Sequence, residues 1–186
     1  MITHIRWSAV VFMLAAAAAI WSGPRPAGAA SAAGLNEDAD AALKKLYQSA
    51  PVAKTIAGKA KAILIFPSIV KAGFVVGAQY GEGVLRKDGK TVGYYNSVAG
   101  SYGLQAGVQS FGYVLFLMTD SAVAYLDNSA GWEIGVGPSI VVVDKGKATS
   151  MTTTTLKDDV YAFIFSQKGL MAGLGIQGSK ITKVAK

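Results

Sequence analysis

An α+β fold is the architecture that the sequence predicts: a coiled, mainly antiparallel β-sheet or small barrel with two short N-terminal helices. Residues 35–61 are rich in Ala and Lys and place apolar side chains at helical spacing. The residues after them form short runs of strand-forming side chains separated by tight turns, which favours antiparallel pairing. Glycine is concentrated in the same part, since 18 of the 22 Gly lie between Gly73 and Gly178.

Residues 1–30 have the layout of a secretory signal peptide. An apolar run, Ser8–Ile20, is followed by small residues that suit cleavage near Ala29 or Ala30. The run is shorter than the roughly 20 residues that a membrane span needs, so an uncleaved anchor fits less well. No Cys follows the run, which excludes a lipid-modified N-terminus. We expect residues 31–186 to form a single exported domain, periplasmic or secreted.

The charge of residues 31–186 indicates the chemistry of the partner. Removing Arg6 and Arg25 leaves 16 Lys and Arg against 11 Asp and Glu, a net charge of +5. Such a balance favours phospholipid headgroups, anionic glycans or nucleic acid. An exported protein rarely meets nucleic acid, so we expect an anionic surface and no nucleic acid as the partner.

Two helices open the predicted domain. Apolar residues recur at spacings of three and four at positions 39, 43, 46 and 50, and again at 53, 56, 57 and 60. Pro51 lies between the two sets and suits the first turn of a helix better than its interior. The pattern predicts helices over residues 37–49 and 51–60.

Strands follow. Four runs are apolar on both faces, as covered strands are: 62–66, 111–118, 140–143 and 160–165. The sequence also predicts a hairpin of 83–87 with 91–95 around Asp88-Gly89, one helical turn over 120–126 capped by Thr119 or Asp120, and a reversal at 144–147 before a Thr-rich strand at 152–155.

A pattern Gly-(Leu/Phe)-x-x-Gly occurs three times, at residues 73–77, 103–107 and 169–173. Residues four apart in a strand lie on the same face, so both glycines remove side chains from that face. This permits close backbone approach or sharp coiling. A transmembrane helix motif with the same spacing is excluded because no segment here is long enough.

Most catalytic chemistry is absent from the composition. The chain has no Cys, and its single His, His4, lies in the predicted signal peptide. Residues 31–186 therefore contain no Ser-His or Cys-His pair and no imidazole or thiolate metal ligand. A turn or cap explains the adjacent carboxylates Asp158-Asp159, and nothing places Glu82 and Glu133 together as a glycosidase pair.

Three short motifs resemble nucleotide-binding or catalytic sites but lack the neighbouring residues that such sites require. Residues 173–178 spell GxGxxG, but the chain ends too soon for the helix and acidic residue that a dinucleotide site needs. Residues 89–91 lack the earlier glycine of a P-loop, and residues 68–71 lack the companion motifs of a Ser-Lys nucleophile. We expect no enzyme activity, no cofactor and no metal.

A basic segment coincides with the predicted helices. Amphipathic helices with lysines on the polar face bind anionic interfaces. The alternative is a solvated face whose apolar side packs on the sheet. The candidate lipid-binding residues are Lys44, Lys45, Lys54, Lys59, Lys61 and Lys71.

Several longer motifs resemble the SYLF domain family, over about residues 43–181. They are residues 60–77 (AKAILIFPSIVKAGFVVG), 80–85 (YGEGVL), 93–96 (GYYN), 103–109 (GLQAGVQ) and 169–173 (GLMAG). The resemblance implies lipid binding: eukaryotic members bind phosphoinositides and some bundle actin, and bacterial members are exported lipid-binding proteins. The predicted export argues against actin as the native partner.

The sequence thus predicts a non-enzymatic protein that binds anionic phospholipid at a membrane surface through its Lys-rich helices on a Gly-rich sheet. The alternative is a structural or protein-interaction module of the cell envelope, in which the sheet assembles with itself or a partner and the helices cover the core.

Overall fold

The computed structural model describes residues 30–128, 132–133, 136–143, 156–169 and 179–186, with the side chains of residue 75 and of residues 101–106 left aside. The chain divides into Met1–Ala30 and a compact unit, Ser31–Lys186. The predicted signal peptide therefore lies outside the described residues, as do the predicted reversal at 144–147, the strand at 152–155 and the GxGxxG motif. None of the helices in the described part has the length and apolar character to cross a membrane.

Both predicted N-terminal helices are confirmed, with different ends. α1 spans Ala32–Ser49 and α2 spans Val52–Ala57. α1 begins earlier than predicted because the Ser31 hydroxyl accepts a hydrogen bond from the Gly34 amide and caps the first turn. Pro51 precedes the first residue of α2, where its missing N–H costs no helical bond.

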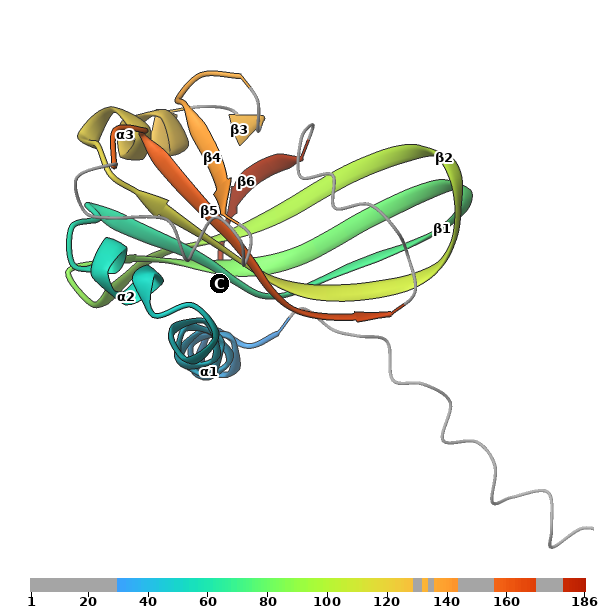
Figure 1. Cartoon of the computed structure of the whole chain (residues 1–186), viewed down its shortest axis with the longest axis horizontal. Helices are drawn as coiled ribbons and strands as arrows, with labels where there is room; N and C mark the ends of the chain where they lie inside the picture. The colour runs from blue at the N-terminus through green and yellow to red at the C-terminus, as the bar shows by residue number, and fades with distance from the viewer. Residues whose placement is uncertain (1–29, 129–131, 134–135, 144–155, 170–178) are drawn as a thin grey trace, which may run out of the picture. The chain divides into compact units, whose positions relative to one another are not determined.

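Among the residues that the structure describes, six strands form one sheet, which is curled into a mostly antiparallel half-barrel (Figure 1). The order is β3-β6-β2-β5-β4, with β1 also paired to β2, and only β4 and β5 run parallel. The predicted α+β class and antiparallel sheet are confirmed. The bounds are β1 Ala62–Lys87, β2 Lys90–Leu117, β3 Trp132–Glu133, β4 Ile140–Val143, β5 Val160–Gly169 and β6 Lys180–Val184, with α3 at Asp120–Asn128.

β1 and β2 form a long hairpin around the predicted Asp88-Gly89 turn, in which both residues have positive φ (50° and 75°). The sequence predicted shorter, separate strands at 62–66, 83–87 and 91–95. The structure instead joins them into strands of 26 and 28 residues that curve back on themselves (Figure 1).

Glycines let β1 double back. A Cβ atom on Gly73 would lie 2.4 Å from the Gly77 Cα, and one on Gly81 would lie 2.8 Å from the Ser68 carbonyl oxygen. A Cβ on Gly83 would likewise meet the Phe66 ring at 2.6 Å. The two halves of β1 therefore approach so closely that no side chain fits at these three glycines, which confirms the close approach predicted for the 73–77 pattern.

The core cluster lies between the sheet and α3. It includes Phe66, Tyr113 and Trp132, all buried, and the Trp132 ring meets the Tyr125 ring of α3 edge-on. α3 is the predicted turn at 120–126, extended by two residues. The Thr119 hydroxyl accepts a hydrogen bond from the Ala122 amide and so caps the helix.

Candidate functional site

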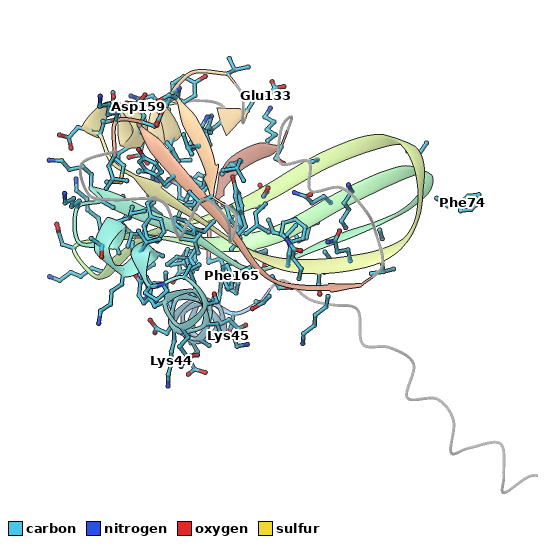
Figure 2. The ribbon with its side chains drawn as sticks, viewed as in Figure 1. Lys44, Lys45, Phe74, Glu133, Asp159 and Phe165 are labelled. Atoms are coloured by element: carbon cyan, nitrogen blue, oxygen red, sulfur yellow. The ribbon has the colours of Figure 1, made fainter. Side chains whose placement is uncertain are left out.

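Four of the predicted lysines lie exposed on the two N-terminal helices: Lys44 and Lys45 on α1, and Lys54 and Lys59 on or directly after α2. α1 turns its apolar face inward and buries Leu35, Ala39, Ala42, Leu43 and Leu46. The lysines occupy the opposite, solvent side of the helix, as Figure 2 shows for Lys44 and Lys45. Both predictions for this segment are thus compatible: the helices cover the core and also present a basic face.

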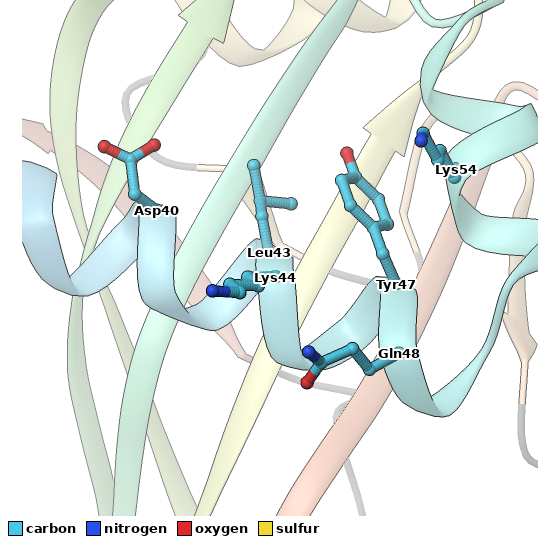
Figure 3. Close-up of a pocket in the computed structure, with 6 residues that line it drawn as sticks. All are labelled: Asp40, Leu43, Lys44, Tyr47, Gln48 and Lys54. Carbon is cyan, nitrogen blue, oxygen red and sulfur yellow. The ribbon is translucent and has the colours of Figure 1, made fainter.

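A shallow depression of about 440 Å³ lies between the helices (Figure 3). Its lining residues are Asp40, Leu43, Lys44, Tyr47, Gln48 and Lys54. Lys44 and Lys54 come from different helices and both border it. Burial raises the pKa of Tyr47, so its hydroxyl stays protonated at neutral pH. Two ammonium groups, a phenolic hydroxyl and an amide are donors that suit the oxygens of a phosphate group.

The one carboxylate of the depression is already paired. The Arg86 guanidinium of β1 donates a hydrogen bond to Asp40 Oδ1, and this bond holds the Asp40 pKa below its ordinary value. Arg86 also donates to the Asn36 carbonyl oxygen at 3.2 Å. In the part of the chain that the structure describes, no ion pair involves Lys44 or Lys54. The depression therefore has a positive balance.

Lys61 and Lys71 lie apart from these four. The Lys61 Nζ is 3.5 Å from Asp120 Oδ2, so its charge is partly compensated. Lys71 is only 7% exposed and lies within β1, in register with Gln109 of β2. We expected Lys71 to extend the basic helical surface. Its burial shows that it does not, because the strand register turns its side chain to the inner face of the curled hairpin.

The apparent catalytic groups have structural roles. Asp159 accepts hydrogen bonds from the Ser139 amide and hydroxyl, both at 3.0 Å, and Asp158 accepts one from the Tyr161 hydroxyl at 3.3 Å. Glu82 and Glu133 are on β1 and β3, which β2 and β6 separate in the sheet, so they are not brought together.

The other motifs are likewise structural. Ser68 is exposed while Lys71 is buried, so the Ser-Lys spacing does not form a pair. Residues 89–91 form the end of a hairpin turn and the start of β2. Across the described ranges, no group of three or more His, Cys, Asp or Glu residues is placed to hold a metal ion.

Tyr47 and Gln48 are members of the depression that the sequence reasoning missed. They follow Asp40 at positions i+7 and i+8 and Lys44 at positions i+3 and i+4, which is the spacing of one helical stripe. A search along that stripe, rather than for lysines alone, would have found them. The contribution of Lys54 depends on how α2 packs beside α1, which the spacing does not give.

Residues 98–186 match the family model of Ysc84, described as Las17-binding protein actin regulator. The match begins inside β2 and continues through α3 and the strands β3 to β6, so it includes neither the N-terminal helices nor β1. No curated protein sequence matches the chain.

Proposed function

Because residues 98–186 form a Ysc84 (SYLF) family domain, we propose that this protein binds anionic phospholipid at a membrane surface through the lysines of α1 and α2. The family is a non-catalytic binding domain known for lipid and actin binding. The SYLF resemblance is thereby confirmed for residues 98–186, and its extension over residues 43–97 stays a prediction.

The observation that carries the proposal is the convergence of Lys44 and Lys54 on one depression. These lysines lie outside the residues that match the family, so the proposal rests on their geometry. A phosphate headgroup in the depression would face both ammonium groups and the Tyr47 hydroxyl, with Asp40 neutralised by Arg86.

The strength of this binding follows from simple electrostatics. A lysine near an anionic membrane contributes about 1 kcal/mol, and this contribution falls off within a Debye length. Lys44, Lys45, Lys54 and Lys59 together give moderate, reversible and salt-dependent binding. Lys61 contributes less because of Asp120, and Lys71 does not reach the surface.

The place of action is part of the same proposal. If residues 1–30 are cleaved on export, the remaining domain meets the anionic lipids of a cell envelope and does not meet actin. An envelope module that assembles through its sheet is the alternative, and it requires a stable oligomer that does not bind vesicles.

Flotation with vesicles tests the proposal. The test uses residues 31–186, because this compact unit contains every core residue and lacks the apolar N-terminal run, which would itself enter vesicles. We expect binding to vesicles that contain phosphatidylglycerol and little binding to pure phosphatidylcholine. The double variant Lys44→Glu/Lys54→Glu should bind about tenfold to a hundredfold more weakly at low salt.

The matched control changes the same net charge elsewhere. Lys90 and Lys157 are exposed, lie outside α1 and α2 in the sequence, and do not line the depression. Lys90→Glu/Lys157→Glu should therefore retain most of the binding. Equal losses in the two double variants, or no preference for anionic vesicles, would disprove the proposed site.

A further inference from the structure

The far part of the β1–β2 hairpin, which we call the hairpin bend (residues 69–80 and 98–110), has reversed polarity. Sheets normally place apolar side chains inside and polar ones outside. Here the buried side chains of the bend include Lys71, Gln79 and Gln109. The large apolar side chains exposed on its outer face are Val70, Phe74, Val76, Tyr80, Val98 and Val108.

Phe74 is the most exposed of these residues. Its exposed fraction is 77%, against 64% for Val76 and 62% for Val108. Figure 2 shows the Phe74 ring pointing away from the body of the domain, at the end opposite to α3. Exposed apolar side chains on neighbouring strands, such as Tyr80 and Val98, which are in register, are typical of a contact with an apolar partner.

The backbone fixes this orientation. Gly73 and Gly77 approach each other on the inner side of the bend, and Phe74 and Val76 are turned outward. Inside, Gln79 Nε2 donates a hydrogen bond to the Ser179 hydroxyl at 3.4 Å. For the apolar side chains to turn inward, they would have to enter the space where the glycines approach each other. They would also displace the buried polar side chains and break the hydrogen bond of Gln79.

Charge distinguishes between the possible partners. The hairpin bend contains no Asp or Glu, its own charged residue Lys71 is buried, and Glu82 just beyond it accepts a hydrogen bond from the Tyr80 hydroxyl at 3.2 Å. The neighbouring end of β5 adds Lys168, which is in register with Ser110. A second copy of the chain would bring like charges together, which is unfavourable. The exposed Lys168 beside these apolar side chains, with the Glu82 carboxylate already paired to Lys186 Nζ at 3.0 Å, instead matches an anionic bilayer, with acyl chains below the phosphates.

We propose that the hairpin bend inserts into the interfacial region of an anionic lipid bilayer, with Phe74 as the leading side chain. Val76 and Val108 follow it, and Tyr80 lies where its ring and hydroxyl can sit at headgroup depth. This is a second lipid contact, made by residues other than the depression on α1 and α2.

Tryptophan fluorescence tests the insertion. Residues 31–186 contain a single Trp, Trp132, which is buried and serves as an internal reference. Phe74→Trp places a reporter at the bend, and Val92→Trp places a matched reporter at a 50% exposed position near the other end of the hairpin. With vesicles of phosphatidylglycerol and phosphatidylcholine brominated in the acyl chains, we expect quenching and a blue shift for Phe74→Trp alone.

A second pair of variants measures the contribution to affinity. Phe74→Asp should weaken binding to the same vesicles without bromine by about tenfold or more, because an apolar contact is replaced by a charge. Val92→Asp should leave the affinity unchanged. Circular dichroism and the emission of Trp132 report whether each variant is folded.

The outcomes separate this inference from the proposed function. An unquenched Trp at position 74 in protein that floats with vesicles would overturn the insertion and leave the lysine site intact. A blue-shifted Trp without vesicles would also overturn it, in favour of a second copy if the protein is dimeric in light scattering. Conversely, quenching that persists in Lys44→Glu/Lys54→Glu with unchanged affinity would support the bend and disprove the lysine site.

Discussion

Thr91 and Asn36 are joined by a hydrogen bond of 2.6 Å, from the threonine hydroxyl to the amide oxygen. The same asparagine donates through Nδ2 to the Tyr94 hydroxyl at 2.9 Å and to the Ala32 carbonyl oxygen at 2.7 Å. These bonds and the Arg86–Asp40 pair connect α1 to the first residues of the hairpin. The basic face of α1 is therefore held by polar contacts as well as by its buried leucines.

Asn36→Ala should release this connection. It leaves Thr91 and Tyr94 without their partner, so we expect the free energy of unfolding to fall by about 1–3 kcal/mol. Gln48→Ala is the matched control, since Gln48 is an exposed amide on the same helix, and its effect should stay within about 0.5 kcal/mol. Urea unfolding followed by circular dichroism measures both, and equal effects would contradict the role of Asn36.

Gly73→Ala should destabilise the hairpin bend. The new Cβ would lie 2.4 Å from the Gly77 Cα, and relieving that overlap costs about 1–3 kcal/mol. Gly100→Ala in β2 has no atom within 4 Å of the new Cβ and should be neutral or stabilising. Thermal unfolding of the two variants side by side gives the comparison; a stable Gly73→Ala protein would mean that the two halves of β1 do not touch there.

Acid should weaken the junction between β4 and β5. Hydrogen bonds from the Ser139 amide and hydroxyl lower the pKa of Asp159 from its ordinary value of 3.8. Because the folded state favours the carboxylate, this stabilisation is present above about pH 4 and is lost as the pH falls through the lowered pKa. Asp159 is partly exposed, so we expect less than about 1 kcal/mol.

The variant Asp159→Asn isolates this contribution. It should lose stability at pH 7 but little at pH 2, so its difference from the original chain shrinks with acid. Asp38→Asn on α1 serves as the control, because the described residues show no hydrogen bond to the Asp38 side chain. A constant difference across pH would argue against the carboxylate as the cause.

Loss of charge at Lys44 should weaken vesicle binding, whereas loss of charge at Lys71 should not. Lys71→Met keeps a long side chain in the buried position and removes a charge from it, so stability should be unchanged or raised. Its binding to anionic vesicles should change by less than about twofold. Lys44→Met should leave stability unchanged and weaken binding by about fivefold. Vesicle flotation and urea unfolding on both variants measure these effects.

The fold was predictable where local chemistry decides it. Asp88-Gly89 specified the turn, β4 has the predicted bounds at 140–143, and Pro51 separated the two helices. The doubling back of β1 was not predictable, since strand periodicity continues through the bend. The sequence indicated only that Gly73 and Gly77 would allow coiling.

The part of the site that lies on α1 was predictable, because helical periodicity is also a local property of the sequence. Exposed lysines on a helix follow from periodicity, which placed Lys44 and Lys45 on the solvent face. The side of the sheet to which Lys71 points depends on the register shift between Phe66 and Ile69, around Pro67, and one extra residue there exchanges the two faces. Counting along the sequence does not reveal such a shift.

The pairing of β1 with β2 also determines where the domain can be divided. Residues 98–186 match the family, but that range starts inside β2 and omits its partner strand. A fragment limited to it would leave Leu115 and Phe116 without the strand opposite them and would expose an unpaired backbone edge. Such an edge invites pairing between molecules and hence aggregation. The unit that can be expressed and handled therefore begins near Ser31, well before the family match does.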